Sequence, residues 1–354
     1  MAYTTINDPS AHFQTVLWTG NGTAGNAVTF DGNSDMQPDF VWSKRRDSAT
    51  HHVLKDTSTG GTSNNDQHLV SSLTQAENTY AQYRMNFDSN GFTLGGVGDS
   101  GFQAIGTSMV SWAWKANGGT TSTNNDGDVT STVQVNQDAG FSIVTWTVGL
   151  GAGNHSVGHG LGVKPAMFIT KSRGNASYWT LWHQGMTGDT SYIRLDATTG
   201  EQTFSDVWGD GITSSVFGYN YPATVYVQPY IAYCFAEKQG YSKFGNYVGN
   251  GNADGPFVYT GFKPAFLMMK ESSSSGGNWV MFDNKRDTGN VTKHRLFPNL
   301  TNADNTTRNY IDLLSNGFKM RNTDVDHNAS GATIIYMAFA ENPFVAGGIP
   351  TTAR

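Results

Sequence analysis

The chain is poor in charge, in cysteine and in long apolar stretches, and each scarcity removes a class of protein. Charged residues make up 14% of the 354 residues, against 37% hydrophobic ones, which is too little charge for a disordered polyelectrolyte. The only cysteine is Cys234, so a secreted scaffold held by internal disulfides is excluded. Because the sequence has no run of about 18 apolar residues, we expect no membrane insertion.

Basic clusters and targeting signals are also scarce. The net charge is −6, and the densest basic cluster is Lys44-Arg45-Arg46, so we expect no nucleic-acid partner. The opening residues Met1–Asn7 lack the basic and apolar regions of a signal peptide, which predicts synthesis in the cytoplasm without one.

Glycine and aromatic residues are what the chain has in abundance. It holds 42 Gly and nine Trp, aromatic residues reach 12%, and helix patterns rich in Ala, Leu, Glu and Lys are absent. This mixture is typical of many short strands joined by tight turns, with enough large side chains for compact cores. The composition therefore predicts an all-β fold.

Internal repetition is the most informative feature of the sequence. Three segments share landmarks in the same order, among them a proline followed by five residues and a lysine. These pairs are Pro38 and Lys44, Pro165 and Lys171, and Pro264 and Lys270. Each segment closes with an apolar strand: Val110-Ser111-Trp112-Ala113-Trp114, Ile231-Ala232-Tyr233-Cys234-Phe235 and Ile335-Tyr336-Met337-Ala338-Phe339.

The spacing of these landmarks divides the chain. The landmark proline of repeat 2 lies 127 residues after that of repeat 1, and the one of repeat 3 lies 99 residues further on. The second and third repeats therefore abut, whereas an insertion rich in Thr, Asn and Gly separates the first two. We expect a linker there that leaves the first repeat freer than the other two. The predicted division is an N-terminal arm (1–13), repeat 1 (14–116), the linker (117–139), repeat 2 (140–239), repeat 3 (240–346) and a C-terminal tail (347–354).

Side-chain alternation identifies each repeat as an antiparallel β-sandwich. In the closing strands, large residues such as Trp112 and Trp114 share one face, and small ones such as Ala113 occupy the other. Small side chains there suggest that a second sheet packs closely. The same alternation favours a core role for Trp42 over a sugar platform. It favours an architectural role for Lys44, Lys171 and Lys270, because three identical catalytic sites in one chain would be unusual.

Catalytic motifs are not recognisable in the sequence. It holds five Glu in all and no nucleophile elbow, P-loop or H-E-x-x-H motif, so we expect no enzyme. His155 and His159 would lie about 13 Å apart on a strand, too far to share one zinc ion. No cofactor is expected beyond a structural Ca²⁺ at Asp126 and Asp128, with the Asp31–Asp35 turn as a similar candidate. An ordinary solvated β-turn is the favoured interpretation of both segments.

Aromatic residues of repeat 2 are the candidate ligand-binding residues. Aromatic faces stack on sugar rings, and neighbouring Asn and Asp side chains read hydroxyl groups. Trp208 has no equivalent in the other repeats, so the repeat pattern does not explain it, although core or inter-domain packing is favoured over ligand binding there. The candidates are Tyr178, Trp182, Trp208, Tyr219 and Tyr221.

Four stretches make the chain resemble a family of virion structural proteins, often tail-fibre-like, from marine tailed bacteriophages. They are Met1–Pro9, Ile231–Gly245, Gly249–Val258 and Ile335–Phe344, and the resemblance covers essentially the whole chain. It implies tandem lectin-like or jelly-roll-like sandwiches in the virion and carries over no catalytic or binding residue.

Three functions share this fold and stay open. The first is a tail-fibre, tail-tip or head-fibre adhesin that binds a host surface glycan or receptor. The second is a purely architectural capsid-decoration or tail scaffold protein. The third is a polysaccharide depolymerase, which would need two carboxylates about 5–10 Å apart in a cleft. Because virion proteins assemble around symmetry axes, we expect other virion proteins as partners and a homo-oligomer, with a trimer favoured.

Overall fold

The computed structural model describes residues 4–59, 66–96, 102–148, 152–221, 227–343, 345–346 and 349–350. Strands make up 45% of the protein and helices 3%, in several antiparallel sheets without a barrel, so the predicted all-β sandwich fold is confirmed. The helical segments are η1 (Pro9–Ala11), η2 (Ala81–Tyr83) and α1 (Val325–Asn328). None of the helices in these ranges is long and apolar enough to cross a membrane.

Each repeat contains four neighbouring strands in the same order, which we call its inner sheet; in repeat 2 these are the middle four strands of an eight-stranded sheet. The closing strand lies second in this order and pairs with the strand that carries the proline and lysine landmarks. In repeat 1 the order is β1 (Phe13–Thr19), β9 (Ser108–Trp114), β3 (Phe40–Arg45) and β4 (Val53–Asp56). In repeat 2 it is β12 (Phe141–Val148), β19 (Gln228–Phe235), β14 (Met167–Ser172) and β15 (Thr180–His183). In repeat 3 it is β20 (Ser242–Val248), β26 (Thr333–Pro343), β22 (Phe262–Glu271) and β23 (Val280–Asp283).

A smaller outer sheet covers one face of each inner sheet. The small residues of the closing strands, such as Ala113, Cys234 and Ala338, lie in the apolar core between the two layers. The outer sheets are β2 (Asn26–Thr29), β8 (Gly91–Leu94) and β7 (Met85–Asp88); β13 (Gly153–Gly158) and β18 (Val216–Tyr221); and β21 (Phe257–Tyr259), β25 (Gly317–Met320) and β24 (Ile311–Leu314). Two further short pairs are β5 (Gln67–His68) with β6 (Asn78–Thr79), and β27 (Val345–Ala346) with β28 (Ile349–Pro350).

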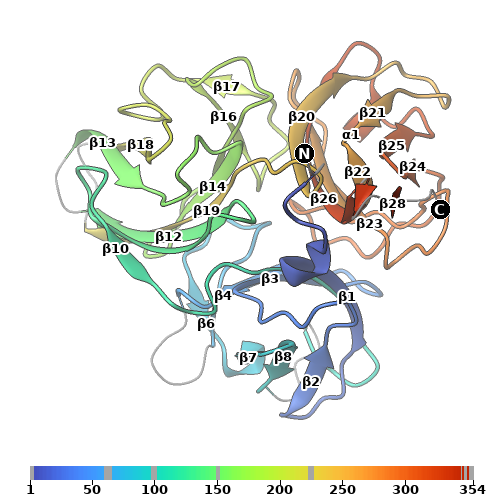
Figure 1. Ribbon diagram of the computed structural model, residues 1–354, viewed down its shortest axis with the longest axis horizontal. Helices are drawn as coiled ribbons and strands as arrows, with labels where there is room; N and C mark the ends of the chain where they lie inside the picture. The colour runs from blue at the N-terminus through green and yellow to red at the C-terminus, as the bar shows by residue number, and fades with distance from the viewer. Residues whose placement is uncertain are drawn as a thin grey trace.

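The other faces of the three inner sheets meet in one central core. Figure 1 shows the repeats as three lobes around a common centre. Trp114, Phe235 and Phe339 hold the same position in the three closing strands, and their rings touch in a triangle with centroid separations of 6.2, 6.0 and 5.6 Å. Trp42, predicted as a core residue, lies in the same cluster. The chain thus forms a pseudo-threefold body in which every repeat contributes to one core.

Equivalent hydrogen bonds join each repeat to the next, and we call these contacts the first–second, second–third and third–first seams. One backbone pair recurs at all of them: Ser177 N to Thr74 O at 2.7 Å, Gly276 N to Thr198 O at 2.9 Å, and Thr50 N to Thr301 O at 2.8 Å. The last residue of β4, β15 and β23 also reaches across a seam. Asp56 accepts from Tyr233 Oη, His183 Nε2 donates to Tyr336 O, and Asp283 accepts from Trp112 Nε1.

The three recurring lysines are buried at the seams. Lys171 Nζ donates to Thr74 O at 2.9 Å, and Lys270 Nζ lies 3.4 Å from Thr198 O, so each reaches the preceding repeat. Lys44 Nζ donates to Arg45 O at 2.6 Å. Burial lowers the pKa of each of the three lysines to about 8. Their contacts with backbone carbonyls agree with the architectural role inferred from the repeats.

The predicted linker over residues 117–139 is wrong. It contains β10 (Ser122–Asn124) and β11 (Ser131–Asn136), and β11 pairs with β12 along its whole length. Gln134 of β11 is buried and donates to Thr57 Oγ1 of repeat 1 at 2.8 Å. The insertion therefore extends the inner sheet of repeat 2 through β10 and β11, while β16 (Ser191–Arg194) and β17 (Gln202–Thr203) extend its other edge. Repeat 1 is fixed to repeat 2 by these bonds and by the central core.

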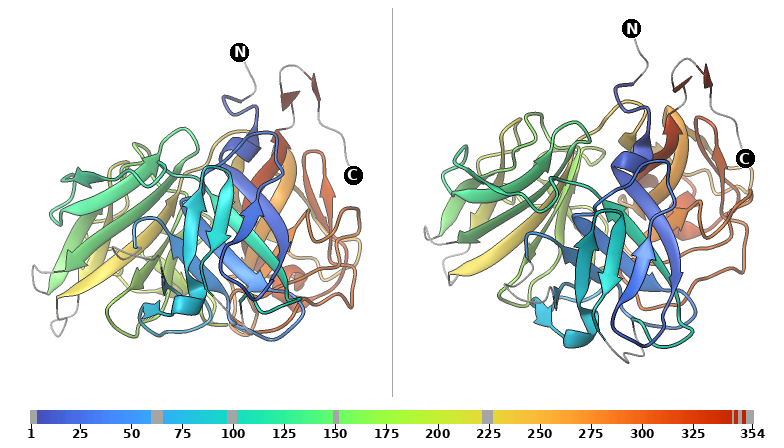
Figure 2. Two further views of the ribbon diagram at one scale, coloured as in Figure 1. Left: turned by 90° about the horizontal axis from the view of Figure 1, so that it is seen from below. Right: turned by 60° about the horizontal axis from the view of Figure 1, so that its bottom comes forward.

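The described part of the predicted arm and strand β28 of the predicted tail lie toward one end of the molecule. Figure 2 shows η1 and the β27–β28 pair on the same side in both views. Thr4 Oγ1 donates to Gln239 O at 2.6 Å, and Ile6 enters the central core, so the arm is anchored between repeats 2 and 3. In the predicted tail, 347–348 and 351–354 lie outside the described residues.

Buried histidines predict a loss of stability in mild acid. Burial lowers the pKa of His68, His159 and His183 from 6.5 to about 4. The unfolded chain takes up protons on these side chains near pH 6.5, whereas the folded chain does so only near pH 4, so their contribution to stability is complete above 6.5 and is lost as the pH falls toward 4. We expect the urea midpoint to fall across this window and His183→Gln to reduce the slope. An unchanged slope in the variant would contradict the assignment.

Candidate functional site

Two of the candidate ligand-binding residues, Trp182 and Trp208, are core residues, so neither belongs to a binding site; for Trp208 this is the core packing that the sequence favoured. Trp182 and Trp208 are 3% and 2% exposed, and both belong to the apolar core of repeat 2. The Trp208 indole packs edge-on against Phe168 at 4.6 Å, and its Nε1 donates to Ser191 O at 2.8 Å. Neither ring is available for stacking on a ligand, because both are buried in this core.

The proposed tyrosines differ in their surroundings. Tyr178 is 49% exposed, but the Arg194 guanidinium lies 3.6 Å from its ring centroid and covers one face. Tyr219 is partly buried and packs against Trp146 and Tyr230. The side chain of Tyr221 lies outside the described residues. The structure therefore does not gather the five aromatic residues into one site.

The proposed calcium ligands point to different partners. Asp128 accepts hydrogen bonds from His155 Nδ1 at 2.7 Å and from Ser156 Oγ at 2.9 Å, whereas Asp126 accepts from Asn124 Nδ2 at 3.0 Å. Across the described ranges, no three His, Cys, Asp or Glu side chains come together as a metal site would require. The Asp126–Asp128 turn thus uses its carboxylates to hold the start of repeat 2 together.

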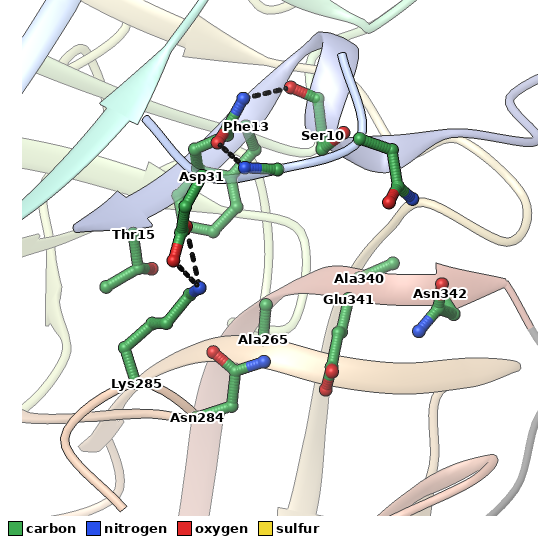
Figure 3. A pocket seen from close by; sticks show the side chains of 13 residues that line it. Ser10, Phe13, Thr15, Asp31, Ala265, Asn284, Lys285, Ala340, Glu341 and Asn342 are labelled. Carbon is green, nitrogen blue, oxygen red and sulfur yellow. Dashed lines mark hydrogen bonds and ion pairs between the residues drawn. The ribbon is translucent and has the colours of Figure 1, made fainter. Parts of the chain in front are cut away.

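A pocket of about 280 Å³ lies at the third–first seam and is a candidate site (Figure 3). Small and apolar residues, namely Phe13, Ala265 and Ala340, belong to its wall. Polar side chains and the Asp31–Asn33 turn make up the rest of the lining. The polar residues are Ser10, Gln14, Thr15, Asp31, Asn33, Asn284, Lys285, Glu341 and Asn342. We call this the seam pocket.

Charges of both signs line the seam pocket. Lys285 Nζ lies 2.7 and 2.9 Å from the two carboxylate oxygens of Asp31, so this ion pair joins repeat 3 to repeat 1. Glu341 pairs with Lys263 at 3.3 Å. Gln14 is fixed by Nε2 bonds to Ser10 O and Ser34 O, both at 2.9 Å, and by a bond from Gly32 N to its Oε1. Ion pairs and hydrogen bonds therefore fix the positions of the donors and acceptors in the lining.

Comparison of the three seams explains why a pocket exists at this one. The inner-strand position of Ala265 is Asp39 in repeat 1, whose carboxylate accepts bonds from Ala116 N and from the Gly118 and Gly119 amides. Asp39 and buried Gln134 therefore fill the first–second seam.

A polar network fills the corresponding space at the second–third seam. Gln184 Nε2, at the position of Asn284, donates to Phe244 O at 2.7 Å, and Glu237 pairs with Lys243 at 2.6 Å. At the third–first seam, the shorter Asn284 leaves the space open.

Sequence reasoning missed the seam pocket because its walls lie far apart in the chain. Residues 10–33 form one side and residues 265–342 form the other. One signal pointed toward it: the Asp31–Asp35 turn, noted as an ion site, supplies Asp31, Gly32 and Asn33 to the lining. In the structure, the charge partner of Asp31 is Lys285 of repeat 3.

The comparisons with known proteins identify the family without describing an activity. No curated protein matches the chain. A family model described as a domain of unknown function, DUF7483, matches residues 8–343, which include all three sandwiches and both sides of the seam pocket. The chain therefore belongs to the DUF7483 family.

Proposed function

We propose that the protein is a non-enzymatic structural protein of the bacteriophage virion surface, a tail-fibre, tail-tip or head-fibre adhesin whose seam pocket binds a host surface glycan. The observation that carries this proposal is the seam pocket itself, a preformed polar recess between repeats 3 and 1. The sequence resemblance supports the virion assignment, and synthesis in the host cytoplasm follows from it.

The chemistry of the lining supports a polyhydroxylated ligand. Each sugar hydroxyl group donates one hydrogen bond and accepts others, so a glycan site needs donors and acceptors close together. The amides of Asn33 and Asn342, the Thr15 hydroxyl and the Asp31–Lys285 pair supply both kinds. Ala265 and Ala340 leave space on the apolar side, where a sugar ring can lie without a stacking aromatic residue.

The carboxylates of the pocket support binding better than hydrolysis. A glycosidase needs one carboxyl group kept protonated as a general acid, usually in apolar surroundings. Asp31 pairs with Lys285, and Glu341 pairs with Lys263. Both carboxylates thus have a cationic partner, which suits hydrogen bonding to hydroxyl groups and does not suit proton donation. We therefore propose an adhesin in preference to a depolymerase.

The remaining partners are part of the same proposal. Other virion proteins hold the chain on the particle, and a homotrimer is the assembly that the class of protein favours. The pseudo-threefold body supports an architectural role as the second candidate function, because a single chain already presents three similar faces around one centre.

Binding to immobilised bacterial surface polysaccharides tests the adhesin. We expect saturable binding that falls about tenfold in Lys285→Ala and in Asn342→Ala, the cost of losing one hydrogen bond to a charged or well-placed polar group. Lys293→Ala, at an exposed lysine of the same repeat outside the pocket, is the control and should bind as the unaltered protein does. Equal binding by all variants would rule out the seam pocket. A folded chain that binds no polysaccharide would favour the architectural role.

A further inference from the structure

An arginine–carboxylate pair closes two of the three seams at the same position. At the first–second seam, Arg173 donates to Glu77 from Nε at 3.0 Å and from Nη2 at 2.8 Å. At the third–first seam, Arg46 Nε lies 3.3 Å from Asp304 Oδ2. A backbone bond fixes the equivalence, because Glu77 N donates to Arg173 O and Asp304 N donates to Arg46 O.

The second–third seam has the carboxylate but not the arginine. Glu201 N donates to Ser272 O at 2.7 Å, which places Glu201 at the position of Glu77 and Ser272 at the position of Arg173. Arg286, which adds a second cation beside Asp304, corresponds to Met186 at this seam, three residues after the last residue of the fourth inner strand in each case. Two arginine side chains found at the third–first seam are thus replaced by an uncharged serine and methionine.

A pocket of about 270 Å³ lies where these arginines would be. Its lining includes Met186, Thr187, Glu201, Asn246, Ser272 and Thr333. Glu201 is the only charged residue of this lining. We call it the carboxylate pocket.

Hydrogen bonds to one oxygen of the Glu201 carboxylate hold the group in place, and its other oxygen stays available for a ligand. Oε1 accepts a bond from Thr187 N at 2.9 Å and another from Thr187 Oγ1. Within the described ranges, Oε2 has no hydrogen-bond donor, whereas both oxygens of Glu77 have one from Arg173. The pocket thus contains a fixed, half-satisfied carboxylate beside an open space of arginine size.

We propose that the carboxylate pocket binds an arginine side chain of a partner protein, which completes from outside the ion pair that the other two seams form within the chain. The planar guanidinium matches a carboxylate with two parallel bonds, as Arg173 does on Glu77. Met186 offers an apolar surface for the aliphatic part of the side chain, and the short Ser272 leaves unfilled the position that an arginine holds at the other two seams. This inference does not depend on glycan binding at the seam pocket.

Titration with N-acetyl-arginine amide, followed by chemical-shift changes or calorimetry, tests the proposal. We expect saturable binding that weakens at least about tenfold in Glu201→Gln, since a hydrogen-bonded charge pair is lost. N-acetyl-citrulline amide is an uncharged analogue of the same shape. It should bind the unaltered protein as weakly as N-acetyl-arginine amide binds the Glu201→Gln variant. Glu237→Gln, which removes a carboxylate at the same seam outside the pocket, is the matched control and should leave binding unchanged.

Ser272→Arg is the complementary variant. It should restore the third in-chain pair, raise the thermal midpoint and abolish binding of the arginine probe. Binding that persists in Ser272→Arg or in Glu201→Gln, or no saturation at tens of millimolar probe, would overturn the proposal. Free arginine that binds where the blocked form does not would assign the pocket to a small molecule and would refute a protein partner.

Discussion

Replacing Phe235 with alanine is expected to lower the free energy of unfolding by about 3–5 kcal/mol, the usual cost of deleting a buried aromatic ring. Phe235 is 2% exposed and forms one corner of the triangle with Trp114 and Phe339. It also stacks on Phe141 at 5.0 Å within its own repeat. The cavity left by alanine would thus open at the point where all three repeats meet. Urea denaturation measures the change.

Phe204 provides the matched control for this variant. It lies in the same repeat but is 53% exposed, so Phe204→Ala should change the free energy of unfolding by less than about 0.5 kcal/mol. A cost below about 1 kcal/mol for Phe235→Ala would mean that the central triangle contributes little to packing.

Removing the Arg286 guanidinium is expected to cost about 3–5 kcal/mol, because it leaves buried carboxylates without their cation. The side chain is fully buried; its Nε donates to Asp283 Oδ2 at 2.6 Å, and its Nη1 donates to Asp304 Oδ1 at 2.9 Å. Asp283 in turn accepts from Trp112 of repeat 1. The Arg286→Met variant keeps the aliphatic volume and removes the charge, so urea denaturation at neutral pH reports the electrostatic loss.

The titration of Asp304 gives a second readout for Arg286→Met. Although burial opposes it, Arg286 and His294 lower the pKa of Asp304. Without Arg286 this carboxyl group should take up a proton at a higher pH, so part of the lost stability should return on mild acidification. Arg308→Ala is the control, since Arg308 is 62% exposed and pairs weakly with Asp324 at 3.7 Å. A similar small cost for both variants would show that the buried network is not needed for stability.

The fold within each repeat was predictable, whereas the arrangement of the repeats was not. Alternation in the closing strands placed Ala113 and Cys234 against a second layer, and the outer sheets lie there. The same pattern predicts that Trp114 and Phe235 are buried, but it does not identify the surface against which they pack. Nothing local in these strands distinguishes a partner sheet in the same repeat from two sheets in the other repeats. The shared core depends on contacts between residues more than a hundred positions apart.

The errors at the candidate site have related causes. Polar composition suggested a linker, yet Ser131 and Val133 are buried with the exposed Thr132 between them, as a half-buried strand requires, and Gln134 is buried as well. Trp208 has no counterpart in the other repeats because repeat 2 has its own outer-layer segment, whose packing that residue completes. The serine at position 272, where the other repeats have Arg46 and Arg173, was visible in the repeat pattern. Its meaning required the position of Glu201 across the seam.

Hydrogen exchange followed by mass spectrometry on the Phe235→Ala variant tests most directly whether the three repeats form one body. If they share a core, exchange should accelerate in the closing strands of all three repeats, β9, β19 and β26, to similar extents. Acceleration confined to β19 and its neighbours in repeat 2, with β9 and β26 unchanged, would contradict a common core and describe three sandwiches that merely touch.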